Sequence, residues 1–593
     1  MTASSRPPPR AVRERAHFLP TPTPTPTRAE RRQRHNSNPP TTTRPGTGGW
    51  FSPTPGVVTM TTHSTSASSR WSGPYLAVDG RPFLVVGAEV HNSSSSTPSA
   101  IADSFAAVRA LGANTVLAPV AWDLFEPVEG HFDHTLVDAM IKQAQQLGMR
   151  LIPLWFGAYK NAVSTYAPGW VKTDSERFPR TQVADGQRIE QLTPFAPAAR
   201  AADARAFGAL MRRIHDVDTA GTVLAVQVEN EMGLLGDSRD RSPLANAAFI
   251  ADVPPGVIEA VATDTNMPLH QVWVDAGSRA EGAWSEVFGS GERVDEAFMA
   301  AAYAAYTEEV ASAGASEHDV PLFVNAWLDH DSVLDGPVAV AGGKRPGQYP
   351  SGGPVMPVAA IWEAMAPTVD FLAPDMYIED AEPVMAAYRA RRGRLLIPEL
   401  RADARGLAQM FSAIGTHQAL GVSPFGVDVL RSDEPVGAAL SDAYQLLRAA
   451  AVLIRQHAIA PVVGFELNAA QPSLSIDLGG SVLQVDTHSE WGPAPEYPGY
   501  GLAFEADGGV YVIGRGFWIT LRGETGQEVS FLQADQYRLQ GEQLVLSHRL
   551  NGDETSGGTL VPFPFAGAPL LPGRVIPTRI PDSGITHIRT YSY

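Results

Sequence analysis

The sequence predicts an α/β fold, a (β/α)8 barrel, followed by a domain that is an antiparallel β-sandwich. Eight short apolar runs alternate with longer segments of helical period, which is the pattern of repeated βα units. Eight such units favour a closed barrel over an open sheet. Near residue 460 the pattern changes to short alternating strands with Gly, Asp and Asn turns. We therefore expect the barrel over residues 71–460 and the sandwich over 461–593.

The candidate barrel strands are nearly continuous apolar runs. A parallel strand is covered by helices on one side and by the barrel interior on the other, so both of its faces carry apolar side chains. These runs are residues 82–89, 113–120, 150–157, 222–230, 321–327, 369–377, 394–400 and 420–428.

The first two helices between these runs are well marked. Thr97 is a suitable N-cap, Pro98 fits the first helical position, and Gly112 follows the helical sequence as a stop signal. The second helix lies within residues 136–148, and its apolar stripe consists of Leu136, Met140, Ala144 and Leu147.

The N-terminal segment differs from the rest of the chain. Residues 1–70 are rich in Pro, Thr and Arg and hold few bulky apolar groups, so we expect them to be disordered. Residues 1–60 hold nine Arg and two acidic residues, and a basic binding tail is an alternative interpretation. No apolar segment typical of a secretory signal follows the early arginines, which favours a cytoplasmic location.

Composition excludes several classes of function. Without cysteine there can be no disulfide, thiol nucleophile or Cys-ligated metal. A formal charge of −18 argues against nucleic acid and anionic membranes as partners, and no apolar run is long enough to span a bilayer. The phosphate-binding loop, the HExxH zinc helix and the GxSxG nucleophile motif are missing. We expect an enzyme that needs no cofactor and no metal.

The residues that follow barrel strands carry the chemical prediction, because reactive groups of a barrel enzyme lie at the carboxyl-terminal strand ends. Glu231 ends the fourth run together with Asn230, and Glu399 ends the seventh run. Strands four and seven lie on opposite sides of a barrel, so the two carboxyl groups can face each other across its mouth. Retaining glycosidases need two such carboxyl groups, one protonated as acid and one ionised as nucleophile.

Three segments resemble glycoside hydrolase family 35, the β-galactosidases. QVENEMG at residues 227–233 is similar to the family signature QxENExG. AWDLFEPVEGHFD at residues 121–133 resembles the tryptophan-containing segment after the second strand. Residues 154–180 resemble family members that carry an additional C-terminal β domain. The resemblance covers about residues 75–593.

The resemblance implies roles for four residues. Glu231 would be the acid/base and Glu399 the nucleophile, Asn230 would hold the 2-hydroxyl of the sugar, and Tyr377 would position Glu399 through its hydroxyl. The sequence departs from the family where IPELR lacks the aromatic residue that often follows the nucleophile, and where the residues before Trp122 are not YVPW. These departures concern the choice of sugar and aglycone.

Further residues near strand ends are candidates for sugar contacts. Aromatic rings pack on the C–H face of a sugar, and polar groups bind its hydroxyls. The aromatic candidates, for which core packing is the alternative, are Trp122, Trp155, Trp327 and Phe425. The polar candidates, for which an internally bonded role is the alternative, are Glu89, His91, Asn325, Lys160 and Asn161. Glu126 and Glu129 are interpreted as structural residues of the turn after the second strand.

We therefore expect a retaining exo-glycosidase that releases terminal β-galactosyl residues from oligo- or polysaccharides. Its partner is a carbohydrate with a terminal β-linked sugar. The same mechanism on a β-glucoside or a β-fucoside is the alternative enzyme, and a non-catalytic carbohydrate-binding protein is the alternative outside the enzymes. The C-terminal region is interpreted as an accessory domain that packs on the barrel, with a carbohydrate-binding module as the alternative.

Overall fold

The computed structural model describes residues 70–330, 343–457, 462–478, 481–487, 498–523, 527–550, 552–566 and 582–593. The predicted disorder and the basic-tail alternative concern residues that lie, apart from Arg70, outside this described part. None of the helices in the described part is long and apolar enough to cross a membrane.

Eight parallel strands form the barrel, and the prediction of a (β/α)8 fold is confirmed. They are hydrogen-bonded in the order β11-β10-β9-β6-β5-β4-β13-β12, and a parallel bridge between Met376 and Leu400 joins the two ends of this order. Each predicted run overlaps one of them. Their bounds are β4 (Val85–Glu89), β5 (Thr115–Ala121), β6 (Arg150–Lys160), β9 (Val226–Asn230), β10 (Leu322–Ala326), β11 (Phe371–Pro374), β12 (Leu396–Leu400) and β13 (Gly421–Pro424).

A small antiparallel sheet precedes the barrel and was not predicted. It consists of β1 (Trp71–Ser72), β2 (Tyr75–Val78) and β3 (Arg81–Phe83), so the first predicted run is divided between two sheets. Leu76 packs in one apolar cluster with Val85 and Phe371, which lie at the first residues of barrel strands. The sheet therefore closes the amino-terminal end of the barrel and leaves the opposite end for chemistry.

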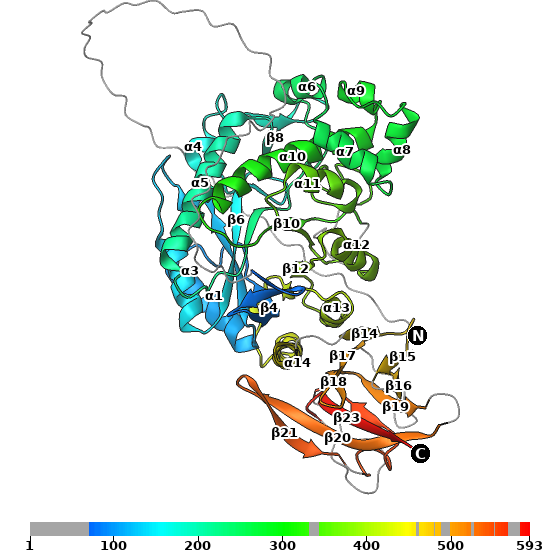
Figure 1. Cartoon of the computed structure of the whole chain (residues 1–593). Coiled ribbons are helices and arrows are strands. Elements are labelled where there is room, and N and C mark those ends of the chain that lie inside the picture. The colour runs from blue at the N-terminus through cyan, green and yellow to red at the C-terminus, as the bar shows by residue number, and fades with distance from the viewer. Residues whose placement is uncertain are drawn as a thin grey trace, which may run out of the picture. The chain divides into compact units, whose positions relative to one another are not determined.

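Helices surround the strands (Figure 1) and begin where the sequence signals them. Thr97 caps α1 (Pro98–Leu111) by accepting a hydrogen bond from the backbone N–H of Ala100, and Gly112 ends it in the left-handed conformation, at φ 112°. The other helices after the barrel strands are α2 (Trp122–Phe125), α3 (Thr135–Gln146), α5 (Pro197–Val217), α10 (Glu292–Ala315), α11 (Ala359–Met365), α12 (Glu382–Arg392), α13 (Ala404–Gly415) and α14 (Pro435–His457).

Two insertions enlarge the barrel beyond the predicted βα units. The first follows β6 and holds α4 (Gly169–Lys172) and the hairpin of β7 (Arg180–Gln182) and β8 (Arg188–Leu192). The second follows β9, where short helices gather beside α10 and α11 (Figure 1). These helices are α6 (Pro243–Phe249), α7 (Pro255–Thr263), α8 (Pro268–Asp275) and α9 (Trp284–Val287). Two short 3-10 helices, η1 (Met356–Val358) and η2 (Val427–Val429), precede α11 and α14.

The C-terminal region contains two antiparallel sheets that share an apolar core including Phe465, Leu483 and Val512, and the predicted sandwich is confirmed. One sheet has the order β14 (Val463–Leu467), β17 (Gly499–Ala506), β18 (Gly509–Arg515), β23 (Ile585–Ser592), β20 (Val529–Gln540) and β21 (Gln543–Arg549). The other has the order β15 (Ser473–Leu478), β16 (Ser481–Asp486), β19 (Phe517–Arg522) and β22 (Val561–Phe563).

A buried ion pair joins α14 to this sandwich. The guanidinium of Arg515, which is 3% exposed, donates to both carboxylate oxygens of Asp442 over 2.8 and 2.7 Å. Removing one partner of a buried pair leaves the other charge without compensation. We therefore expect Asp442→Ala to destabilise the protein by about 3 kcal/mol, measured as a lower urea midpoint of the full chain.

A matched control for this prediction lies on the surface. Arg431 and Asp433 form a similar pair, but their side chains are 68% and 69% exposed. Exposed pairs contribute little because water screens them. Asp433→Ala should leave the urea midpoint unchanged, and an equal loss in both variants would show that burial of Arg515 is not the cause.

Candidate active site

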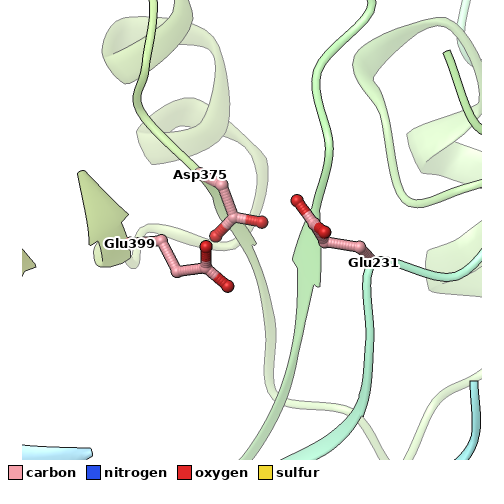
Figure 2. A group of neighbouring side chains, drawn as sticks. All are labelled: Glu231, Asp375 and Glu399. Atoms are coloured by element: carbon pink, nitrogen blue, oxygen red, sulfur yellow. The ribbon is translucent and has the colours of Figure 1, made fainter. Parts of the chain in front are cut away.

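Three carboxyl groups converge at the carboxyl-terminal ends of the barrel strands (Figure 2). Glu231 directly follows β9, Asp375 directly follows β11, and Glu399 lies in β12. One oxygen of each lies within 4.8 Å of the others. The three residues are 3–5% exposed, so their charges are largely withdrawn from water.

The backbone that presents Glu231 is strained. Glu229 and Glu231 have φ values of 59° and 45°, a region that residues other than glycine rarely adopt. Neighbouring strand ends hold this conformation. The Glu231 N–H donates to Asn325 Oδ1 over 2.9 Å, and the Glu231 carbonyl accepts from the N–H of Ala162 over 3.2 Å. Residues of the third and fifth barrel strands, β6 and β10, or of the turns after them therefore fix the backbone of Glu231 and the direction of its side chain.

The surroundings of Glu231 favour a protonated carboxyl group. Burial, followed by the charge of Glu399, raises the pKa of Glu231 to about 8. The ammonium of Lys160 and a hydrogen bond from Asn161 Nδ2, 2.6 Å from Glu231 Oε2, act in the opposite direction. Glu231 thus holds its proton at neutral pH and can deliver it to an oxygen nearby.

Three hydrogen-bond donors and a cation surround Glu399. The hydroxyl of Tyr377 donates to Oε2 over 3.0 Å, and the amides of Asn230 and Asn325 donate to Oε1 over 3.3 and 3.4 Å. Lys160 Nζ lies 4.0 Å from the same oxygen. Hydrogen-bond donors and a cation stabilise negative charge on a neighbouring group.

Lys160 and Glu89 are two further ionisable residues that interact electrostatically with Glu231 and Glu399. Burial alone would lower the pKa of Lys160, but Glu399, Glu231 and further carboxyl groups raise it. Burial raises the pKa of Glu89 well above its usual range, and neither of its oxygens has a hydrogen-bond partner in the described part of the chain. Burial and the neighbouring carboxyl groups thus favour the neutral form of Glu89, and both of its oxygens are available to a hydroxyl group.

Glu231, Asp375 and Glu399 also have the spacing of metal ligands. Among the residues that the structure describes, no other group of three His, Asp or Glu side chains has this spacing. Lys160 faces all three and supplies positive charge there without a metal ion. The arrangement suits acid/base and nucleophilic chemistry.

The structure does not bring Trp122 and Trp155 to this site. Both are completely buried, and their indole N–H groups donate over 2.8 Å to Glu126 and Asp203, respectively. Trp155 packs on Phe207 of α5, with ring centroids 5.9 Å apart. Successive side chains of a strand point to opposite faces, and Trp155 points outward to the helices. Core packing, the alternative considered for both residues, is what the structure shows.

The structural interpretation of the turn after the second strand agrees with the contacts. Glu126 accepts from the indole of Trp122 and from the N–H of Gly130 over 2.7 Å, and Glu129 is paired with Arg177. Neither carboxylate contacts Glu231 or Glu399 in the described contacts.

The remaining candidates for sugar contacts, His91, Phe425 and Trp327, differ in their contacts. His91 Nδ1 lies 2.8 Å from Asp428 Oδ1, and its ring packs edge-on against Phe425 at 5.4 Å. These two rings are therefore tied to the segment after β13 and have no described contact with the carboxyl groups. Trp327 follows β10, and its buried indole N–H has no hydrogen-bond partner among the described residues, so it can donate to a ligand.

Asp375 was missed at the sequence level. The apolar run was taken to extend to Tyr377, whereas β11 ends at Pro374. Asp375 is therefore the first residue after a barrel strand, the same position that identified Glu231. The signal in the sequence that could have found it is an aspartate that directly follows the apolar residues FLAP at 371–374.

Comparison with known proteins supports the family resemblance. Residues 75–307 match the model of glycosyl hydrolases family 35, a span that includes β9 and Glu231. This part of the barrel is therefore similar to the family 35 glycosyl hydrolases. Residues 440–562 match a second model, described as a domain of unknown function (DUF5597). The barrel that is similar to family 35 is thus followed by an additional C-terminal β domain, as the resemblance implied.

Curated proteins that are similar to part of this chain are named β-galactosidase or β-galactosidase-like. A human β-galactosidase-1-like protein 3 is 27% identical over 198 residues, which are 32% of this chain and 27% of the human protein. A β-galactosidase of Xanthomonas manihotis is 30% identical over 172 residues, 28% of this chain and 26% of that protein. The match thus spans about a quarter of the length of these relatives.

Among solved structures, the β-galactosidase from the psychrophilic Marinomonas ef1 superimposes with a TM-score of 0.43 and 12% identity. The match covers 64% of this chain and 61% of that chain.

Proposed function

We propose that the chain is a retaining exo-β-galactosidase, with Glu231 as acid/base and Glu399 as nucleophile. The separation of the two carboxyl groups carries the mechanistic part of this proposal. Their nearest oxygens lie within 4.8 Å, close to the separation of about 5–5.5 Å in retaining glycosidases. Inverting enzymes hold their carboxyl groups about 6.5–9.5 Å apart, because a water molecule must fit between one of them and the sugar.

The contacts support a double displacement. Glu399 attacks the anomeric carbon as Glu231 transfers its proton to the departing glycosidic oxygen, which leaves a covalent glycosyl-enzyme and an ionised Glu231. Glu231 then takes a proton from water, the hydroxide oxygen displaces Glu399, and both carboxyl groups return to their starting states. Tyr377 and the two amides hold Glu399 in the direction of attack.

Sugar recognition rests on polar atoms that have no partner inside the protein. Asn230 Oδ1, both oxygens of Glu89 and the indole N–H of Trp327 are buried and meet no hydrogen-bond partner among the described residues. Buried polar groups are rarely left unpaired, so a hydroxylated ligand would satisfy them. The preference for galactose is supported by the names of the curated relatives.

A panel of nitrophenyl glycosides tests the substrate. The β-galactoside should give the highest kcat/KM, and a β-linked galacto-oligosaccharide should release free galactose from its non-reducing end. Turnover of the β-glucoside or β-fucoside without turnover of the β-galactoside would replace galactose as the substrate. Sugar binding without any turnover would instead support a carbohydrate-binding protein.

The pH dependence of the reaction follows from Glu231. The acid must be protonated for the first step, and its raised pKa of about 8 means that the protonated fraction falls as the pH rises through this value. The wild-type profile of kcat/KM should therefore be flat around neutral pH and decline tenfold per pH unit well above pH 8. A decline that begins near the ordinary pKa of a glutamic acid would contradict this role.

A further inference from the structure

The two oxygens of Asp375 have unequal surroundings. Oδ2 accepts a hydrogen bond from Asn325 Nδ2 over 2.8 Å. Oδ1 is buried and meets no nitrogen or hydroxyl donor in the described part of the chain. Figure 2 shows the Asp375 and Glu231 carboxyl groups directed toward each other. An unpaired carboxylate oxygen in this position is costly, because it is removed from water and faces a second acidic group.

The charges of the site cannot all be present at once. Four buried carboxyl groups surround one ammonium group, which would give three uncompensated negative charges if every acid were ionised. Like charges at such distances force protonation of some members. Ionisable groups from five other elements and from its own loop face Asp375. They are Glu231, Glu399, Glu89, Lys160, Tyr388 and, in its own loop, Tyr377.

Asp375 is suited to keep a proton. Burial, followed by the charges of Glu399, Glu231 and Glu89, raises its pKa well above the usual range, and Lys160 compensates only in part. Since Asn325 donates to Oδ2, the proton belongs on Oδ1, and the Asp375 carboxyl group is directed toward that of Glu231 (Figure 2). A neutral acid thus converts the unfavourable contact between two acceptors into a hydrogen bond.

We propose that Asp375 is a positioning residue for the acid/base, a neutral carboxylic acid whose Oδ1–H donates a hydrogen bond to Glu231. The effect of Asp375 on catalysis rests on the proposed acid/base function of Glu231. Asp375 keeps its own proton throughout the reaction. When Glu231 has given its proton to the leaving oxygen, the hydrogen bond stabilises the resulting carboxylate, and it weakens again when Glu231 is reprotonated by water.

Two substitutions separate this role from a structural one. In Asp375→Asn the amide nitrogen can take the place of the Oδ1–H group while its carbonyl still accepts from Asn325, so the donor is kept. Asp375→Ala removes the donor. A hydrogen bond to a charged group is worth enough to shift a pKa by about one to two pH units.

Asp375→Asn should therefore keep kcat/KM for nitrophenyl β-galactoside within about tenfold of wild type, with the basic limb of the pH profile unmoved. Asp375→Ala should move that limb upward by about one to two pH units. Asp380→Asn, a matched change at an exposed position of the same loop, should match wild type. A downward shift in Asp375→Asn would show that Asp375 is ionised, and an unmoved limb in Asp375→Ala would show a purely structural role. Either result overturns the proposal.

Infrared difference spectroscopy gives a reading that needs no turnover. The C=O stretching band of protonated carboxyl groups should be weaker in Asp375→Asn than in wild type at neutral pH, and Asp380→Asn should not weaken it. An unchanged band in Asp375→Asn would overturn the neutral state of Asp375. Failure of the proposed function would appear differently, as wild-type protein without turnover on the glycoside panel.

Discussion

Replacing Glu399 by alanine should lower kcat by about 10⁴-fold or more, since losing a nucleophile removes the covalent route altogether. Three hydrogen-bond donors and the ammonium of Lys160 orient Glu399, and no such set of donors is described for the other carboxyl groups of the site. The fold should persist, because the buried site holds more carboxyl groups than cations, so removal of one carboxyl group relieves their repulsion. Circular dichroism and an unchanged urea midpoint would check this.

External azide tests the nucleophilic role of Glu399 more sharply than loss of activity does. Azide is small enough to enter the space left by the removed carboxylate and attack from the same face. Glu399→Ala should regain turnover of an activated β-galactoside in azide, and the product should be the α-galactosyl azide. Glu281→Ala, at an exposed position, should keep wild-type turnover and show no response to azide. Full activity of Glu399→Ala without azide would remove Glu399 as nucleophile.

Replacing Glu231 by alanine should have the second largest effect, and its size should depend on the leaving group. General acid catalysis contributes roughly 10²–10⁴-fold. Cleavage of an unactivated galactoside should fall by about this factor, because its leaving oxygen needs a proton. Formation of the glycosyl-enzyme from a dinitrophenyl galactoside should change little, because that oxygen leaves as a stable anion.

The second half of the reaction provides a further reading for Glu231→Ala. Without a base, water attacks the glycosyl-enzyme slowly, so the dinitrophenyl substrate should show a burst followed by slow turnover. Azide should accelerate this turnover and give the β-galactosyl azide. The decline of activity above pH 8 should disappear. Equal losses for both leaving groups, with the alkaline decline kept, would contradict the acid/base role of Glu231.

The sequence was sufficient for the barrel because its strands are buried on both faces and therefore appear as apolar runs. The start of α1 was predicted to the residue, since Thr97, Pro98 and Gly112 act through local backbone chemistry. The insertions after β6 and β9 were not predicted. Their short elements depend on packing against α10 and α11, which no local pattern reveals.

The site was predicted where a polar residue directly ends an apolar run, as at Glu231 and Glu399. Lys160 and Asn161 were underrated because the run appeared to end at Gly157, whereas β6 continues to Lys160 and carries both side chains to the carboxyl groups. For Trp155 the prediction erred in the opposite direction, because a residue that lies outside the site was included in it. Its place near a strand end suggested a ligand contact, but the face to which a side chain points depends on strand register, which the sequence does not display.

The configuration of the first sugar released tests the central claim most directly. Proton NMR of the wild-type reaction, recorded before the product mutarotates, distinguishes the two anomers of galactose. Two displacements through Glu399 should give β-galactose first, with the α anomer appearing only by later mutarotation. Initial release of α-galactose would show a single displacement and contradict the assignment of Glu231 and Glu399 to a retaining pair.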